Sequence, residues 1–258
     1  MDSGNTAWVL ASAALILFMT PGLAFFYGGM VRSKHVLGML MQNVFAMGLV
    51  SVLWAVIGFS LAFGGDHPLI GNLDFAFVYD IAEADFAPSG MAFFAFQMMF
   101  AVITPALITG ATADRLKFAG YALFIAIWSI VVYAPVARWV FNANGWIFDM
   151  GALDFAGGAA IHINAGIAAL AVVAVIGPRR GHGTEPMPPH NLPLTVLGTG
   201  ILWFGWFGFN AGSALAADGI ASQALVNTHL AAAAGMLGWL LVEKIKAPKP
   251  VVRIALVG

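Results

Sequence analysis

The stretch Asp154-Phe-Ala-Gly-Gly-Ala-Ala-Ile-His-Ile-Asn-Ala-Gly166 places a histidine, His162, in the middle of an otherwise apolar segment. If this segment is a membrane helix, an ionisable ring at its centre is costly and is a candidate functional residue. The alternative is a neutral imidazole that hydrogen-bonds to a neighbouring helix. The rest of the sequence has to show whether the helix lies in a membrane.

The composition is that of a membrane protein. Of the 258 residues, 61% are hydrophobic and only 9% are charged, whereas about a quarter of a soluble domain is charged. The 30 glycines suit close packing of transmembrane helices. The net charge of −1 leaves no basic cluster on the scale of a nucleic-acid surface, and the sequence has no cysteine for disulfides or thiolate chemistry.

Seven segments are long and apolar enough to cross a bilayer, which takes roughly 20 residues. They are predicted at about 8–31, 40–63, 91–113, 118–138, 155–177, 192–213 and 222–242. The connections are short, apart from the polar stretches 64–89 and 178–192. We therefore expect an all-α polytopic membrane protein with no soluble domain between its spans.

The basic residues predict the orientation of these spans. Ten of the eleven lysines and arginines fall on one side of the predicted membrane, and only Arg138 falls on the other. The positive-inside rule makes the side with ten basic residues cytoplasmic. The N-terminus is then outside, and the chain is a multi-pass protein of the cell membrane.

Asp154 stands where the predicted 155–177 helix begins, and a carboxylate there can cap the free backbone N–H groups. A carboxylate at the outer mouth of a pore can also attract a cation, and one side chain can do both. Asp154 and His162 are eight residues apart and have no further ligand at helical spacing, so a metal site is not expected.

The other histidines have no predicted role. Four lie in predicted loops, where we expect them to be solvated: His35, His67, His182 and His190. His229 lies in the seventh span and is expected to be packed and hydrogen-bonded.

The third span carries Phe96-Gln-Met-Met-Phe100, which places two phenyl rings on one helix face. Such a pair is ordinarily core packing, but ring faces also bind cations and can close a narrow pore. In the first span, Pro21-Gly22 predicts a kink or a freed carbonyl.

The sixth span combines small and aromatic residues. Gly208 and Gly212 have the small-xxx-small spacing of close helix packing. Trp206, Phe209 and Ser213 add aromatic faces and a hydroxyl, which suit an ammonium-like cation better than sodium.

Four stretches together resemble the ammonium transporter (Amt/Mep/Rh) family. They are Met19-Thr-Pro-Gly-Leu-Ala-Phe-Phe-Tyr-Gly-Gly29, Phe96-Gln-Met-Met-Phe100, Gly151-Ala-Leu-Asp-Phe-Ala-Gly-Gly158 through His162-Ile-Asn-Ala-Gly166, and Gly205-Trp-Phe-Gly-Phe-Asn-Ala-Gly-Ser213. The resemblance extends to about Pro250, so it predicts an ammonium transporter domain over 1–250 and a divergent end over 251–258.

The resemblance implies a bundle of about eleven spans, ten of them in two inverted repeats, assembled as a homotrimer with one hydrophobic pore per subunit. It makes Phe96 and Phe100 a stacked phenyl gate and His162 the first histidine of a pore-lining pair. It also implies an outer ammonium-recruitment site formed by Trp206, Ser213, Asp154 and Phe141. Phe141 stands where the family usually has a tryptophan.

The implied function is transport of ammonium or ammonia, with methylammonium as an analogue, by a protein that is not an enzyme and needs no cofactor. A dry pore disfavours the charged form and so favours loss of a proton, and a pore histidine offers a ring nitrogen in place of water. A membrane ammonium sensor on the same scaffold is the alternative. An intramembrane enzyme would need metal ligands or a nucleophile that this sequence does not place near His162.

The sequence after Pro250 departs from the family, which continues into further spans and a cytoplasmic tail that can meet a PII-type regulator. We therefore expect a partial chain without the second pore histidine, and one that does not transport by itself.

Overall fold

In the computed structural model, residues 2–246 are described, and they are helical with connecting loops. Within this part of the chain, seven helical segments are long and apolar enough to span a membrane. They cover Ser3–Met30, Ser33–Phe63, Gly90–Thr112, Phe118–Asp149, Gly158–Ile176, Leu192–Ala214 and Gly219–Lys246. Each corresponds to one predicted span, so the predicted fold class is confirmed. The predicted end at 251–258 lies outside the described residues.

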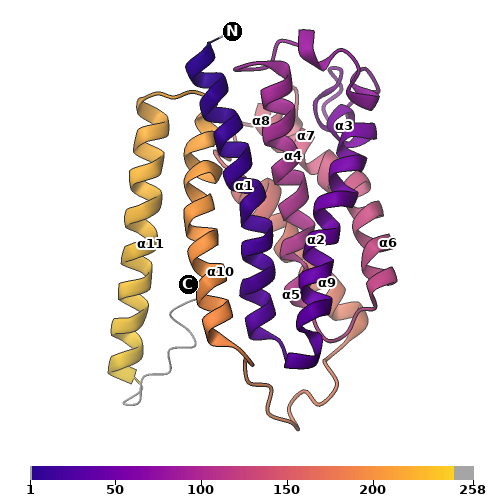
Figure 1. The fold of residues 1–258 in the computed structure, drawn as a ribbon. Helices are drawn as coiled ribbons and strands as arrows, with labels where there is room; N and C mark the ends of the chain where they lie inside the picture. Colours follow the sequence, from indigo (N-terminus) through magenta and orange to yellow (C-terminus); the bar gives the residue numbers. More distant parts are fainter. Residues whose placement is uncertain (1, 247–258) are drawn as a thin grey trace.

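Two spans are single helices, and the other five are composite (Figure 1). The single helices are α1 (Ser3–Met30) and α11 (Gly219–Lys246). The composite spans contain α2 (Val36–Leu53), α3 (Phe59–Phe63), α4 (Gly90–Leu107), α5 (Thr109–Thr112), α6 (Phe118–Trp128), α7 (Ala134–Phe141), α8 (Trp146–Asp149), α9 (Asn164–Ile176) and α10 (Leu192–Trp206).

Four composite spans contain a π-helical turn, a wider turn that often marks a functional segment. These turns are η2 (Trp54–Gly58), η5 (Ser129–Tyr133), η6 (Gly158–Ile163) and η7 (Phe207–Ala211). Of the candidate residues, His162 lies in η6 and Phe209 lies in η7. Both therefore stand where the regular helical hydrogen-bond ladder is interrupted.

The helices form one bundle with α4 at its centre. Of the most apolar window in the α4–α5 span, 78% is buried, whereas the corresponding window of α11 is 0% buried. α1 packs against α2, α4 and α10, and α11 lies at one edge beside α10 (Figure 1). Pro21 is accommodated inside α1, which continues as one helix to Met30.

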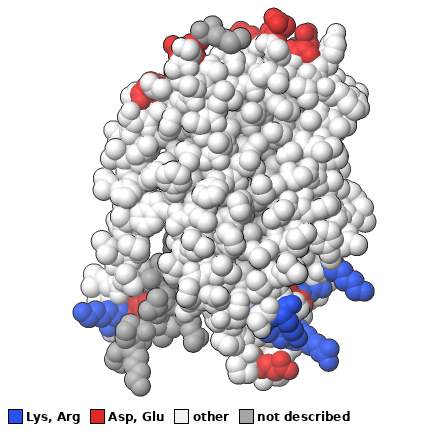
Figure 2. Space-filling view, viewed as in Figure 1, with Lys and Arg blue, Asp and Glu red and all other residues white. Residues whose placement is uncertain are grey.

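Charge is distributed as the positive-inside rule requires. Figure 2 shows most acidic side chains at one end of the molecule and the basic ones at the other. Arg138, the exception on the acidic side, is 0% exposed. Its guanidinium donates to the carbonyls of His67 (3.0 Å), Gly64 (3.0 Å) and Gly65 (2.7 Å), which follow α3. Arg138 therefore satisfies the backbone of an outer loop.

Basic residues at the cytoplasmic end also satisfy carbonyls at helix ends. Arg115 donates to the carbonyls of Ala111 and Gly177, and Arg179 donates to that of Gly110 at 3.4 Å. Burial, followed by the nearby charge of Arg179, lowers the pKa of Arg115, and Asp114 opposes this shift. An arginine keeps its proton even so.

Two of the loop histidines also contact other parts of the protein. His190 places Nδ1 2.9 Å from the carbonyl of Val31, and His35 places Nε2 3.4 Å from a carboxylate oxygen of Asp114. His190 is exposed and the side chain of His35 is 35% exposed, so both remain accessible to solvent while each makes one contact with the protein.

Candidate functional site

Asp154 organises the helix that carries His162. One carboxylate oxygen accepts from the amides of Gly157 (2.6 Å) and Gly158 (2.7 Å), and the other accepts from Ala159 and Ala160 (both 2.9 Å). The capping role predicted for Asp154 is present, although the helix begins at Gly158. Four backbone amides thus occupy the two oxygens of the carboxylate.

The turn before this helix depends on glycine. Gly157 has φ +95°, and a Cβ there would lie 2.3 Å from the Cδ1 atom of Ile161. The amides of both Ile161 and His162 then donate to the carbonyl of Gly157, at 2.9 and 3.0 Å. The second bond spans five residues and makes the turn π-helical, which sets the direction of the His162 side chain.

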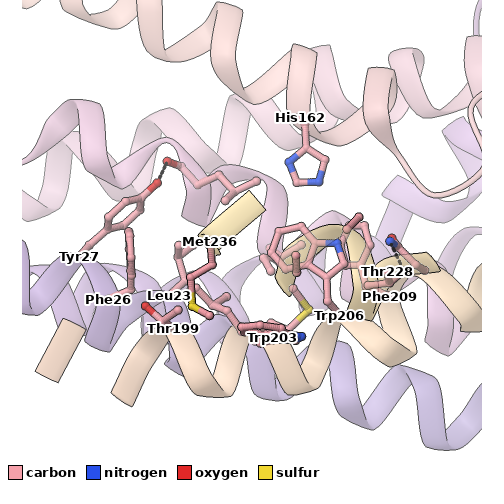
Figure 3. A pocket seen from close by; sticks show the side chains of 17 residues that line it. Leu23, Phe26, Tyr27, His162, Thr199, Trp203, Trp206, Phe209, Thr228 and Met236 are labelled. Atoms are coloured by element: carbon pink, nitrogen blue, oxygen red, sulfur yellow. Dashed lines mark hydrogen bonds between the residues drawn. The ribbon is translucent and has the colours of Figure 1, made fainter. Parts of the chain in front are cut away.

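His162 points into a cavity of about 570 Å³ (Figure 3). The cavity is mostly apolar and reaches from His162 and Phe209 to Phe26 and Tyr27, near the cytoplasmic end of α1. The imidazole lies almost parallel to the ring of Trp206, with centroids 5.8 Å apart and planes 12° apart. His162 is thus on the wall of a partly open space bordered by η6, α1, α4, α10 and α11, and the residue is itself exposed in this chain.

Phe209 joins the two groups of candidate residues; the sequence placed it in an aromatic group with Trp206 and Ser213 but did not assign it to the gate or to the recruitment site. Its ring centroid lies 4.6 Å from that of Phe100, 5.7 Å from that of His162 and 5.5 Å from that of Trp206. Its side chain is 1% exposed. The sequence signal was its place between Trp206 and Ser213, but helical spacing alone did not reveal that it faces Phe100.

The predicted gate pair has a different geometry from the one expected. The rings of Phe96 and Phe100 have centroids 4.8 Å apart but meet edge to face at 70°, so they are not stacked. The edge of Phe96 lies against Gly212, where a Cβ would come within 2.8 Å of the ring. Phe100 instead turns toward Phe209 and Phe141, with the Phe141 ring stacked at 6.2 Å and 27°.

Two of the predicted recruitment residues lie at different levels of the sixth span, Trp206 at the end of α10 and Ser213 in the 3-10 turn η8 (Gly212–Ala214). Trp206 lies one turn before Phe209 and lines the cavity beside His162. Ser213 lies one turn after Phe209, and its hydroxyl donates to the carbonyl of Phe209 at 2.8 Å. The prediction grouped Trp206 with Ser213, but they lie two turns apart along the span, one before and one after Phe209.

His229 packs against two rings of the neighbouring span. Its ring centroid lies 5.6 Å from that of Trp203 and 5.9 Å from that of Phe207. The expected packing is present, but no hydrogen bond to this side chain is formed within the described residues. Asn210, close by, donates to the hydroxyl of Thr228 at 2.8 Å and ties η7 to α11.

The model of the Ammonium Transporter Family matches residues 7–258. The chain belongs to the ammonium transporter family. It is 50% identical to an ammonium transporter of Mycobacterium tuberculosis (strain ATCC 25618 / H37Rv), over 96% of this chain and 58% of the relative. A crystal structure of Candida albicans Mep2 superposes with a TM-score of 0.91 at 35% identity, over 99% of this chain and 58% of that one.

The structure of a Sensor Amt Protein superposes with a TM-score of 0.89 at 30% identity. It covers 95% of this chain, which spans 63% of that protein. The chain therefore spans about three-fifths of the family members that it matches.

Proposed function

We propose that this chain supplies the outer recruitment site, the gate and the first pore histidine of an ammonium transporter. The observation that carries the proposal is the ring of Phe209. It closes the space between Phe100, on the outer side, and the cavity lined by His162. A substrate moving between the two regions would have to displace an aromatic ring.

The outer site is built from Phe141, Phe100 and Ser213. Two stacked ring faces attract a cation through their quadrupoles. The hydroxyl of Ser213 donates its proton to the backbone, so its oxygen lone pairs remain available to accept an N–H bond. The carboxylate of Asp154 adds negative charge near the same end of the pore.

Phe100 and Phe209 form the gate in this proposal, with Phe96 as a supporting residue. Both gate rings are 1% exposed. The two rings therefore exclude water from the passage between the outer site and the cavity. A hydrated cation does not fit between rings whose centroids are 4.6 Å apart. Opening requires side-chain rotation, which is a faster and smaller motion than a shift of helices.

Beyond the gate, the apolar wall penalises a full charge and favours neutral ammonia. Ammonium can meet this condition by releasing a proton, whereas potassium cannot. His162 provides a nitrogen that accepts an N–H hydrogen bond from ammonia or takes up the released proton. Trp206 holds the imidazole plane by lying parallel to it.

Uptake of labelled methylammonium tests this function. We would express the intact protein that carries this chain in cells lacking their own ammonium transporters, with His162→Ala and Thr228→Ala as variants. We expect His162→Ala to lose at least tenfold in uptake at equal membrane abundance. Thr228 also lines the cavity but has no role in the proposed mechanism. As a control, Thr228→Ala should change uptake less than threefold.

Unchanged uptake with His162→Ala would contradict the role of the histidine without affecting the family membership. Binding of ammonium without any uptake would favour an ammonium sensor, which the likeness to the Sensor Amt Protein keeps as a second candidate. Assembly as a homotrimer and contact with a PII-type regulator remain predictions from the resemblance.

A further inference from the structure

A buried arginine lies close to the outer site, on the same helix as Phe141. Arg138 comes less than one turn before Phe141, which is the last residue of α7. The proposed function places Phe141 in the outer site, where its ring stacks on that of Phe100 at 6.2 Å and 27°. The position of the Phe141 ring therefore depends on what holds the end of α7.

Arg138 is held by backbone carbonyls and not by a carboxylate. The residue is 0% exposed, and each of its three guanidinium nitrogens donates to one carbonyl, those of Gly64 (3.0 Å), Gly65 (2.7 Å) and His67 (3.0 Å). None of the ion pairs within residues 2–246 includes Arg138. A buried charge without a carboxylate is costly unless its hydrogen bonds are kept, so this arrangement tolerates little movement.

Two further side chains next to Phe141 bind the same outer loop. Trp139 donates from Nε1 to the carbonyl of Leu69 at 2.7 Å. Asn142 donates from its amide to the carbonyl of Ala62 at 3.4 Å. Side chains on both sides of Phe141 in the sequence are thus fastened to one segment of the chain. We name these three residues the α7 clamp: Arg138, Trp139 and Asn142.

The residues of the α7 clamp differ in their access to water. The bond from Trp139 to Leu69 is exposed, so water can replace the carbonyl if the indole N–H is lost. The bond from Arg138 to Gly64 is buried, and nothing replaces it when the guanidinium is lost. Arg138 is therefore the member of the clamp on which the position of α7 depends most.

The loop that Arg138 binds is itself anchored to α3. The hydroxyl of Ser60 donates to the carbonyl of Asn72 at 2.9 Å, and the amide of Gly71 donates to the carbonyl of Leu61 at 2.6 Å. α3 also packs against α7, and both lie at the same end of the bundle (Figure 1). The guanidinium therefore ties α7 to the outer end of the second span.

We propose that Arg138 is a positioning residue for ammonium recruitment. By tying the end of α7 to the outer end of α3, its guanidinium keeps the Phe141 ring stacked on Phe100, where both rings are available to an incoming cation. This inference rests on the proposed function, in which these rings attract ammonium before it reaches the gate. Arg138 is enclosed and acts on the substrate only through Phe141, so its loss weakens binding without slowing later steps.

The concentration dependence of methylammonium uptake by the intact protein tests this role. Arg138→Lys keeps the charge but loses the planar fork of donors, and Arg138→Gln also removes the charge. Both should raise KM about two- to fivefold, as expected for a lost cation–π contact, and change the maximum rate less than about twofold. Trp139→Phe is the control: it removes one exposed bond to the same loop and should leave KM unchanged.

The Arg138→Gln variant separates positioning from a direct effect of charge. If the positive charge of Arg138 simply repelled ammonium, Arg138→Gln would lower KM and Arg138→Lys would leave it unchanged. That pattern would overturn the inference. If the Arg138 variants do not reach the membrane, Asn142→Ala decides, because it removes the other buried bond of the clamp. It should raise KM about twofold, and an unchanged KM would overturn the inference.

A fluorine resonance distinguishes failure of this inference from failure of the proposed function. A fluorinated phenylalanine at position 141 reports the surroundings of the ring by NMR without any transport. Arg138→Lys should shift or broaden its resonance, and an unchanged resonance would overturn the inference. An unchanged KM in the Arg138 variants would do the same if Phe141→Leu raises KM. An unchanged KM in Phe141→Leu would instead contradict the outer site of the proposed function.

Discussion

At the scale of single residues, four rings and one carboxylate define the site. Phe209 touches Phe100 on one side and His162 with Trp206 on the other, so it is the residue that separates the outer region from the cavity. Asp154 fixes the start of the helix by accepting four hydrogen bonds from backbone amides. His162 lies about two turns further along.

Replacement of Asp154 by alanine should destabilise the protein by about 1–2 kcal/mol, because an N-cap carboxylate is lost together with four charge-assisted bonds. Asp154→Asn keeps one oxygen as an acceptor and should cost about half as much. Thermal unfolding in detergent measures both changes. Equal stability of Asp154→Ala and the unmodified protein would mean that the Asp154 cap does not contribute to the free energy of unfolding.

Phe209→Leu should let potassium through, because a smaller side chain no longer closes the space beside Phe100. The matched variant Phe96→Leu removes a ring of the same size that lies against Gly212, and it should leave the pore closed to potassium. Potassium flux into proteoliposomes that contain the intact protein distinguishes the two. Potassium flux through Phe96→Leu but not through Phe209→Leu would instead support a gate formed by Phe96 and Phe100.

At the scale of elements, α1 and α10 form the closest helix pair around the site. Their contact depends on small residues, as is typical of membrane helices. A Cβ on Gly198 of α10 would lie 2.3 Å from the backbone nitrogen of Phe26 and 2.6 Å from the carbonyl of Gly22. Backbone atoms cannot move aside as side chains can, so this position fixes the distance between the helices.

We therefore expect Gly198→Ala to destabilise the protein by about 1–3 kcal/mol, as overpacking does. Gly200→Ala in the same helix has no atom within 4 Å of the added Cβ and should be neutral or slightly stabilising. The two variants add the same methyl group two residues apart, and unfolding in detergent compares them. A similar loss for both would assign the effect to α10 itself and not to its contact with α1.

At the scale of the whole molecule, the distribution of basic residues predicts the orientation of the bundle. Arg138 is the one basic residue on the acidic side, and its burial explains why it departs from the rule. Arg138 is on the outer side because its guanidinium satisfies three loop carbonyls in an enclosed place. The cytoplasmic arginines Arg115 and Arg179 do the same for helix ends on the other side. A basic residue can therefore satisfy backbone carbonyls by hydrogen bonding, in addition to setting the orientation of a span.

The orientation can be tested by cysteine labelling, since these 258 residues contain no cysteine. Leu153→Cys lies in an outer loop at a position 99% exposed, and His182→Cys lies in an exposed cytoplasmic loop. A membrane-impermeant maleimide should label Leu153→Cys in intact cells and His182→Cys only after the membrane is opened. The reverse pattern would overturn the orientation.

The sequence alone determined the number of spans, their order and their orientation, because these depend on apolar length and on the side to which basic residues fall. It also identified His162, Phe100 and Asp154 as candidates. The tertiary structure decided which rings meet. The π-helical turns η6 and η7 rotate His162 and Phe209 by an amount that regular helical spacing does not give, and only packing between spans brings Phe209 onto Phe100. Trp206 and Ser213 are separated by their positions along one span. Their relation to the rings of other spans depends on packing between helices.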